Sequence, residues 1–236
     1  MDASGKIIYK DLGLIDYKEA WDYQEVLFDS RVQAKIGKGA GEKPLIASLD
    51  NLLLFCEHPH VITLGKSGSM ENLLMDDKFL KQRGVDFYRI NRGGDITYHG
   101  PGQIVGYPVF DLEQFGIGVK KYIELLEEAV IKTLALFGMD SGRLEGATGV
   151  WLEPANPGRA RKICAIGVRS SRHITMHGFA FNVNTDISYY NLIHPCGFTD
   201  KGVTSMEKEL GTKQDMNRVK EVLRDVIVDF FENLSP

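Results

Sequence analysis

One segment of the chain, RGGDITYHGPGQIVGY at residues 92–107, holds five glycines among sixteen residues. An ordinary hairpin needs few glycines, because only its tightest turn requires a positive φ. This density predicts a backbone that lies very close to a ligand or to another strand. A hairpin whose glycines have a purely structural role is the alternative. VDFYRI before the segment and IVGYPVFDL at its end predict strands, so the glycines are expected between or within adjoining strands.

Apolar residues at helical spacing predict four helices, over residues 16–36, 75–84, 122–137 and 216–234. Asp16, followed by Glu19, has the pattern of an N-terminal cap. Gly138 is placed as a C-terminal stop. GKGAGEKP, at residues 37–44, ends the first helix.

The other periodic segments predict strands: LLLFCE, HPHVITLG, GVWL, KICAIGVR and HITMHGFAFNV. Strands grouped between a few helices indicate an α+β fold. The 236 residues, with 43% hydrophobic and 25% charged residues, suit a globular protein, and no repeat or linker divides them. We expect one domain over residues 1–236.

Charge and cysteine content narrow the class of protein. The formal net charge of −4 and the pI near 5.9 favour neither nucleic acid nor an anionic membrane as a partner. No apolar run approaches the ~20 residues of a membrane helix. The three cysteines are an odd number, and the N-terminal residues show no signal or transit pattern. We expect a cytoplasmic protein with reduced thiols.

The local patterns leave two candidate nucleophiles. Lys162 and Cys164 are two residues apart in a predicted strand, so they are expected to share a face, where the cation would favour the thiolate. Cys196 lies between Pro195 and Gly197, in a turn that would present its side chain at a fixed angle. The alternative for each cysteine is a small buried hydrophobe, and Cys56, which follows LLLF, fits that alternative best.

The sequence gives little support for a metal site or a nucleotide-binding site. His173 and His177 are four residues apart, a spacing that shares a face only on a helix, whereas this segment predicts a strand. We therefore expect no metal site. The glycine-rich segment contains neither GxxxxGK[ST] nor GxGxxG opening a helix, so nucleotide binding is not indicated. Its N–H groups are suited to an oxyanion.

Longer motifs resemble a known family. The run RGGDITYHGPGQIVGYP resembles the signature of the octanoyl-[acyl-carrier-protein]:protein octanoyltransferases of lipoate biosynthesis. The likeness continues in EHPHVITLGK, in KICAIGVR followed by TMHGFAFNV, and in HPCGFTDKGVTSMEKEL. It runs in order from about residue 9 to the C-terminus.

This resemblance implies the α+β fold of the biotin and lipoate protein ligases, with mixed sheets and flanking helices. It implies transfer of an octanoyl group from acyl carrier protein to a lysine of a lipoyl domain. The implied acceptors are E2 subunits of 2-oxoacid dehydrogenases and the glycine cleavage H protein, and the enzyme is expected to be a monomer that needs no cofactor. The implied nucleophile is Cys196, and the catalytic lysine is Lys162.

The resemblance also implies a set of substrate-binding residues: Arg92, Gly93, Gly94, Thr97, Tyr98, His99, Gly100, Gln103, Ala165, Ile166, Gly167, His177, Gly178 and Ala180. Gly93 and Gly94 would let the backbone approach the acyl chain or its carbonyl, and His99 would orient the thioester. Lys162, with its pKa lowered by desolvation, would move protons for thiol and amine.

Two features depart from a simple match. Cys164 stands where the family usually has a small residue, and we expect it to pack like an alanine beside the site. An acidic carrier protein fits a negative chain only if basic residues gather near the site, and the candidates are Arg159, Arg161, Arg169 and Arg172. An ordinary solvated charge run is the alternative.

Other functions stay open on sequence alone. An ATP-dependent lipoate or biotin ligase would share the fold, although those ligases carry SGGG and HDxGN motifs in place of the glycine-rich segment. A protein that binds lipoyl domains or acyl carriers without catalysis is a second alternative, and a thioesterase is a third.

Overall fold

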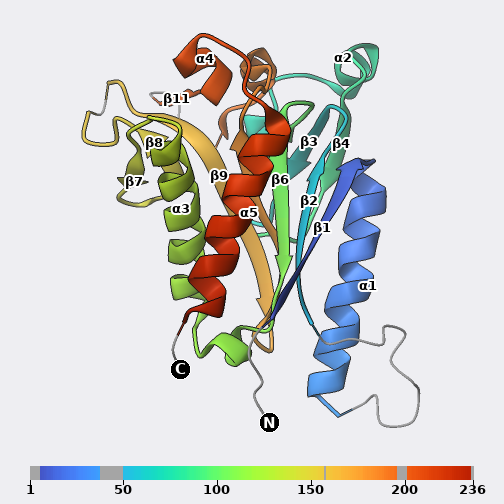
Figure 1. The fold of residues 1–236 in the computed structure, drawn as a ribbon. Helices are drawn as coiled ribbons and strands as arrows, with labels where there is room; N and C mark the ends of the chain where they lie inside the picture. Colours follow the sequence, from blue (N-terminus) through green and yellow to red (C-terminus); the bar gives the residue numbers. More distant parts are fainter. Residues whose placement is uncertain (1–5, 38–49, 157, 196–200, 235–236) are drawn as a thin grey trace.

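The computed structural model describes residues 6–37, 50–156, 158–195 and 201–234. Its main element is a mixed sheet with strand order β1-β2-β6-β10-β9-β8-β7, in which β11 also pairs with β9 (Figure 1). These strands are β1 Ile7–Leu14, β2 Asn51–Glu57, β6 Gln103–Val109, β7 Gly142–Leu144, β8 Ala147–Leu152, β9 Arg161–Ser171, β10 Ile174–Asn182 and β11 Gly202–Val203. The neighbours β6, β10 and β9 pair antiparallel at its centre.

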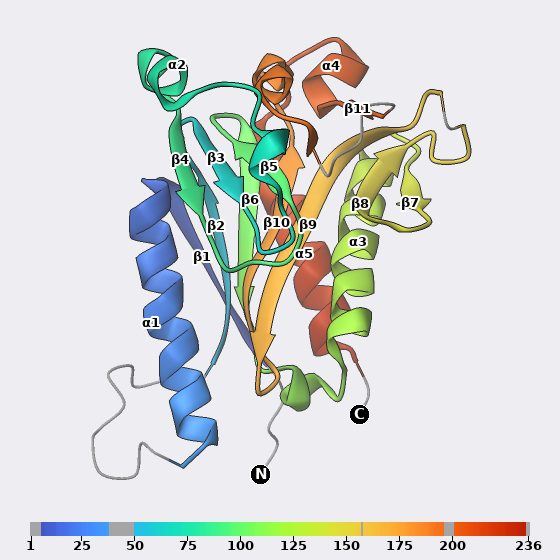
Figure 2. The ribbon, with the colours of Figure 1, turned by 180° about the vertical axis from the view of Figure 1, so that it is seen from behind.

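A second, three-stranded sheet has the order β4-β3-β5. Its strands are β3 Val61–Leu64, β4 Asp86–Arg89 and β5 Ile96–His99. Figure 2 shows this small sheet in front of the large one, on the same side as α1. The helices and short turns are α1 Tyr17–Lys35, α2 Asp77–Gln82, α3 Val119–Leu136, α4 Met206–Leu210, α5 Met216–Glu232, η1 Met70–Asn72, η2 Leu112–Phe115 and η3 Ile187–Leu192.

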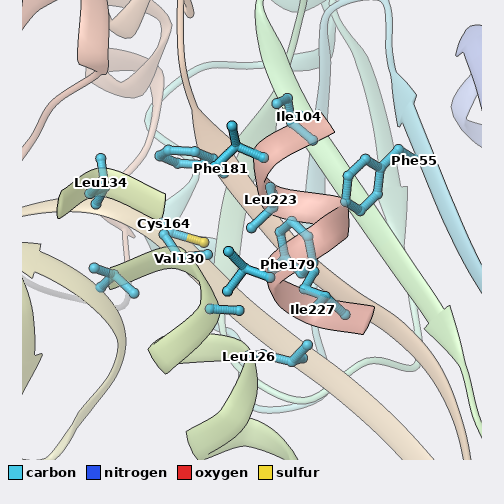
Figure 3. Close-up of a cluster of buried hydrophobic side chains, with 14 of the residues drawn as sticks. Phe55, Ile104, Leu126, Val130, Leu134, Cys164, Phe179, Phe181, Leu223 and Ile227 are labelled. Atoms are coloured by element: carbon cyan, nitrogen blue, oxygen red, sulfur yellow. The ribbon is translucent and has the colours of Figure 1, made fainter. Parts of the chain in front are cut away.

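Helices cover both faces of the large sheet. α3 and α5 pack against each other and lie together on one face, whereas α1 lies on the opposite face, against β10 and β6 (Figures 1 and 2). The main hydrophobic core fills the space between the sheet and the α3–α5 pair. Figure 3 shows Leu126, Val130 and Leu134 of α3 with Leu223 and Ile227 of α5 in this core.

The four predicted helices are present, and their signals explain why. The Asp16 carboxylate accepts from the N–H groups of Lys18 and Glu19, which caps α1. Gly138 follows α3 with a φ of 74°, a conformation that costs little without a Cβ. The expected α+β class is confirmed. Within the described part of the chain, none of the helices is both long and apolar enough to span a bilayer.

The sequence did not predict the edge strand β1 or the short elements β7, β11 and α4. β1 pairs in parallel with β2 at the edge of the sheet, and its alternate residues are not uniformly apolar, so its sequence lacks the period-two signal. β7, β11 and α4 have too few residues for any periodicity. The strands that flank the glycine-rich segment belong to different sheets, with β4 in the small one and β6 in the large one.

One residue changes the phase of β9. Trp151 of β8 pairs with Lys162, but its neighbour Val150 pairs with Cys164, so Ile163 is an extra residue on β9. Such a bulge reverses the alternation of side chains beyond it. Ile163 and Cys164 therefore both enter the main core, and Lys162 lies on the opposite face.

Candidate active site

A cavity of about 660 Å³ lies alongside β9, between the two sheets and the first turns of α3. Its walls come from the glycine-rich segment, from β8, β9 and β10, from two residues each of α3 and β6, and from one residue of α1. The small residues Ala165, Gly167, Gly178 and Ala180 of the paired strands β9 and β10 lie along one side. The cavity is therefore roomy where two strands would otherwise fill the space with side chains.

The cavity opens because β8 leaves β9. At Gly149 the backbone has a φ of 119°, and its N–H donates to the Glu127 carboxylate at 2.8 Å. Glu127 projects from α3, is buried, and also accepts from Arg143 at 2.9 Å. The Gly149 N–H is therefore bonded to this buried carboxylate and not to β9, and the pairing of β8 with β9 ends at Val150 and Cys164. The strand edge of β9 beyond Cys164 thereby faces the cavity.

Lys162 crosses this opening. Its side chain is 8% exposed, and its Nζ donates to the carbonyl of Thr148 at 3.1 Å. The same Nζ lies 4.7 Å from the centre of the Trp151 ring, in cation–π geometry. A buried ammonium group held in this way is fixed in place beside the cavity.

Cys164 does not share a face with Lys162, so the pair predicted from strand alternation is wrong. The bulge at Ile163 turns Cys164 into the core, where it is fully buried beside Val130 (Figure 3). Burial raises the pKa of the Cys164 thiol well above its usual value, although the charge of Lys162 opposes this shift. Cys164 packs as a small hydrophobe, as we expected. Cys56 is also fully buried.

The glycines of the segment bring backbone against backbone. Gly93 donates its N–H to the carbonyl of Val168 at 2.9 Å, which ties the segment to the edge of β9. A Cβ on Gly167 would lie 2.7 Å from the carbonyl oxygen of Gly93. Gly94 has a φ of 86°, and its carbonyl oxygen would lie 2.4 Å from a Cβ on Gly65. The predicted close approach is confirmed, and its partners are other parts of the backbone.

The buried side chain of Arg92 holds the glycine-rich segment in place through hydrogen bonds. Its guanidinium is buried and donates to the carbonyl of Gly93 at 3.0 Å and to the carbonyl of Thr63 at 2.9 Å. A third bond, of 3.0 Å, reaches the Thr63 hydroxyl. Arg92 therefore joins the glycine-rich segment to β3 and brings a positive charge to the cavity wall.

A chain of side-chain amides fixes His99. Asn182 donates to the carbonyl of Thr204 at 3.0 Å, so its oxygen faces Gln103, whose amide nitrogen donates to it at 2.8 Å. The Gln103 oxygen then lies 2.8 Å from Nδ1 of His99. Because this oxygen only accepts, Nδ1 carries the proton and Nε2 of His99 is an acceptor.

The buried histidines near the cavity are neutral. Burial lowers the pKa of His99 to about 3, and the positive charge of Arg92 acts in the same direction. Burial likewise lowers the pKa of His177 to about 3, with Arg92 and Arg169 adding to the effect. His177 also has a φ of 57°, which is uncommon for a residue with a side chain, and its backbone N–H donates to Gln24 at 3.0 Å. Such strain is typical of functional sites.

Comparison with known proteins shows the family. A model of the lipoyl protein ligase A/B catalytic domain matches residues 16–228. The chain belongs to this family. A relative named octanoyltransferase from Parabacteroides distasonis is 58% identical over 223 residues, 94% of this chain and 97% of that protein. Another from Cytophaga hutchinsonii is 52% identical over 227 residues, 96% of this chain and 93% of that protein.

Solved structures of the lipoyl protein ligase A/B kind share the fold. A lipoate-protein ligase A bound with ATP has a TM-score of 0.65 at 15% identity, over 96% of this chain and 85% of that one. LipL1 of P. falciparum in complex with lipoate has a TM-score of 0.69 at 12% identity, over 96% of this chain and 63% of that one. The expected fold and the family resemblance are confirmed, and the chain is an acyltransferase.

Most residues that the sequence predicted for the site line the cavity: Arg92, Gly93, Gly94, Thr97, His99, Lys162, Ala165, Ile166, Gly167, His177, Gly178 and Ala180. Tyr98, Gly100 and Gln103 do not. Tyr98 points away from it on β5 and packs against Tyr189, Gly100 lies against the Tyr98 ring, and Gln103 acts through His99. Cys196 lies outside the described residues.

Sequence reasoning missed several residues that line the cavity: Tyr17, Tyr107, Val119, Ile123, Thr148, Asn182 and Tyr190. Tyr17 stacks on His99 with ring centres 5.7 Å apart, although it lies in α1, far away in the sequence. Val119 and Ile123 lie in the first turns of α3, after Gly118, which offers no side-chain cap. Val119 is an exposed apolar residue at this helix end. Asn182, a polar residue that is 2% exposed in a central strand, carried a signal that sequence reasoning could have used.

The four arginines proposed as one basic patch lie at opposite ends of β9, so that prediction is wrong. Arg161 begins the strand and pairs with Glu209 at 2.5 Å and Glu153 at 2.7 Å, which offsets its charge. Arg159 also pairs with Glu153, at 3.1 Å. Arg169 and Arg172 lie at the far end, around the turn to β10. Across the described residues, no group of histidines, cysteines and carboxylates has the arrangement of a metal site.

Proposed function

We propose that this acyltransferase moves an octanoyl group from the thioester of octanoyl-acyl carrier protein to a lysine of a lipoyl domain, through an acyl thioester on Cys196. The relatives named octanoyltransferase, at 52% to 58% identity over most of the chain, support the choice of acyl group. The observation that carries the proposal is the position of the buried Lys162 ammonium at a cavity whose wall reaches Pro195.

The described residues on either side of Cys196 support its proposed role. Pro195, which precedes Cys196 in the sequence, lines the cavity. On the far side of the segment, Gly202 and Val203 pair with Arg161 and Lys162 of β9. The N–H of Thr204 donates to the carbonyl of Lys162 at 3.0 Å. One flank of the segment that contains Cys196 thus lines the cavity, and the other pairs with β9 at Lys162.

In the first step, the Cys196 thiolate attacks the thioester carbonyl of the donor. The carbon–sulfur bond to the phosphopantetheine arm breaks, a new carbon–sulfur bond to Cys196 forms, and the arm leaves as a thiolate that takes a proton from the Lys162 ammonium. One thioester replaces another, so the step has little net free-energy change. The Lys162 ammonium stabilises the thiolate before attack and the oxyanion during it.

In the second step, the neutral amine of the acceptor lysine attacks the acyl-enzyme. The carbon–sulfur bond to Cys196 breaks as an amide bond forms, and the amine loses a proton. An amine with a usual pKa of ~10.4 is mostly charged at neutral pH, so a proton must leave before or during attack. Lys162, neutral after its proton has gone to the arm, is the group proposed to receive the proton of the amine, which restores the ammonium.

The walls of the cavity suit an acyl chain. Ala165, Gly167, Gly178 and Ala180 line one side with small residues, and the neutral rings of His99 and Tyr17 stack nearby. A neutral imidazole is compatible with a hydrocarbon neighbour, whereas a charged one would lose its hydration. The Nε2 acceptor of His99 lies 3.5 Å from the Thr63 hydroxyl, which can donate to it.

The proposal includes further expectations. The acceptors are E2 subunits of 2-oxoacid dehydrogenases and the glycine cleavage H protein. The donor's arm supplies the only prosthetic group, so the enzyme itself uses no cofactor. The enzyme acts as a monomer in the cytoplasm.

Intact-protein mass spectrometry tests the proposal. The native chain is mixed with octanoyl-acyl carrier protein without acceptor, beside Cys196→Ser and the matched control Cys164→Ser. We expect an octanoyl adduct that hydroxylamine removes and that only Cys196→Ser abolishes. Addition of a lipoyl domain should then move the octanoyl group to it from the native enzyme, and at least 100-fold more slowly from Lys162→Met, given the roughly 10²–10⁴-fold effect of general acid–base catalysis.

Other outcomes identify the alternatives. An adduct lost only in Cys164→Ser would identify Cys164, in the core, as the nucleophile. Loading of free octanoate that requires ATP would identify a ligase, the activity named for the solved lipoate-protein ligase A of similar fold. Release of octanoate to water at the rate of acyl-enzyme formation, even with acceptor present, would identify a thioesterase.

A further inference from the structure

The edge of β9 that faces the cavity has main-chain groups ready for hydrogen bonding. In the antiparallel ladder, residues of β9 alternate between bonding to β10 and pointing away from it. The carbonyl of Val168 points away, because it accepts from Gly93. By the same alternation, the N–H and C=O of Ile166 also point away from β10.

Ile166 lies in a gap between two covered positions of this edge. On one side, β8 covers Cys164, since a Cβ on Gly149 would lie 2.4 Å from the Cys164 carbonyl oxygen. On the other side, the glycine-rich segment covers Val168. Among the described residues, no side chain or backbone group outside the strand ladders bonds to the N–H or C=O of Ile166. Ile166 itself lines the cavity.

An octanoyl chain would leave these groups without partners. A hydrocarbon removes water from an N–H and a C=O but offers no hydrogen bond in return, which is unfavourable. The small residues Ala165 and Gly167 lie on the other face of β9, and their own surface offers the chain no polar side chain. The acyl chain therefore suits that face, and the strand edge suits a substrate segment that contains amides.

We propose that the edge of β9 at Ile166 binds the pantetheine arm of the donor as a short additional strand. The inference rests on the proposed function, because it concerns the arm that carries the octanoyl group. The β-alanine unit of the arm has an N–H and a C=O separated by two carbons. Its C=O accepts from the N–H of Ile166, and its N–H donates to the C=O of Ile166, as in strand addition to a sheet edge.

The position agrees with the proposed chemistry. Ile166 is four residues from Lys162 along β9, and because the extra residue Ile163 adds no pairing step, the separation is about 10 Å at the usual rise of a strand. Only the two-carbon cysteamine unit separates the β-alanine amide from the sulfur, so the thioester lies between Ile166 and Lys162. The exposed Val119 and the half-buried Ile123 of α3 also line the cavity and offer apolar surface to the methylenes of the arm.

Donor analogues test the inference on the native enzyme. We compare S-octanoyl-pantetheine with an analogue in which an ester oxygen replaces the N–H of the β-alanine unit, and measure kcat/KM for transfer to a lipoyl domain. Loss of one net hydrogen bond is expected to lower kcat/KM by roughly 3- to 10-fold. An ester analogue as good as the amide would overturn the inference, with the proposed octanoyl transfer intact.

Protein variants test the same pairing from the side of the enzyme. Ile166→Pro removes the N–H of the strand edge, where proline is tolerated better than in a central strand, and Ile166→Val is the matched control that retains it. A second analogue lacks the carbonyl of the β-alanine unit. With the native enzyme this analogue should have a lower kcat/KM than S-octanoyl-pantetheine. That difference in kcat/KM should vanish in Ile166→Pro and persist in Ile166→Val. A difference of equal size in both variants would contradict the pairing. No transfer from any donor, octanoyl-acyl carrier protein included, would instead refute the proposed function.

Discussion

Gln103 holds His99 through a hydrogen bond of 2.8 Å between its amide oxygen and Nδ1 of the imidazole. Asn182 orients that amide from the other side, and the carbonyl of Thr204 orients Asn182. Thr204 also bonds to the backbone of Lys162. The orientation of a neutral histidine on one wall of the cavity is therefore linked to the strand that carries the lysine on another.

Gln103→Glu should make His99 titrate. A carboxylate beside Nδ1 favours the imidazolium and should raise the pKa of His99 from about 3 by roughly 1–3 units. Carbon-13 NMR of labelled histidine measures this pKa directly. The pH profile of kcat/KM should gain an acidic limb at the new value.

Gln103→Met is the matched control, because it removes the same hydrogen bond without adding a charge. It should lower kcat/KM without moving the pKa of His99 upward. If both variants gave the same NMR titration, the amide would not set the protonation of His99.

Acid should destabilise the protein through its buried histidines. Burial lowers the pKa of His58 to about 4, and the pKa values of His99 and His177 to about 3, whereas the usual value is ~6.5. Between these values the unfolded chain binds more protons than the folded one. Stability is therefore full above pH ~6.5 and falls as the pH drops toward the folded values, by about 2 kcal/mol per histidine at pH 5.

Urea unfolding between pH 8 and pH 5 measures this loss. A variant that replaces one of the three, such as His58→Gln, should lose stability less steeply with falling pH. A native protein whose free energy of unfolding is the same at pH 5 and pH 7 would show that these side chains already bind protons in the fold.

Cys164→Ala should keep the activity and cost little stability. The side chain is fully buried in the main core and the substitution removes one atom, so we expect a loss of about 1 kcal/mol. Cys164→Ser should cost more, because a hydroxyl in this core is poorly paired. Urea unfolding and octanoyl transfer measure both effects. Loss of most activity in Cys164→Ala would overturn its assignment to the core.

Gly167→Ala should push the glycine-rich segment away from β9. The added Cβ would lie 2.7 Å from the carbonyl oxygen of Gly93, and this oxygen belongs to the backbone and cannot rotate away. We expect a loss of about 1–3 kcal/mol in stability and a higher KM for the octanoyl donor.

Gly118→Ala is the control for this substitution, because a Cβ there meets no atom within 4 Å and its φ is not in the positive region. Its KM should match that of the native enzyme. Equal effects of the two substitutions would mean that the contact between Gly167 and Gly93 does not shape the cavity.

The sequence allowed accurate prediction of features that depend on neighbours along the chain. Asp16 and Gly138 mark helix ends through local hydrogen bonds and a local φ, and both were recognised. The glycine-rich segment was recognised as a place of close backbone approach. The partner, Val168, lies 75 positions away from Gly93 and has no local signal.

The errors have the same origin. Strand alternation placed Lys162 and Cys164 on one face, because it assumes one residue per pairing step, whereas the bulge at Ile163 depends on how β8 pairs from the other side. The four arginines looked like one cluster because residues 159–172 are close in sequence. An extended strand separates its two ends by the full length of the large sheet.

The extra residue in β9 gives this strand a position where its length can change without exchanging its faces. Removing Ile163 would make the pairing regular, with Trp151 opposite Lys162 and Val150 opposite Cys164, and would leave Lys162 and Cys164 on opposite faces as they are now. The core would lose one isoleucine side chain, and the cavity would keep Ala165 and Gly167. One residue inserted after Cys164 would instead turn Ala165 and Gly167 toward the core and place larger side chains in the cavity.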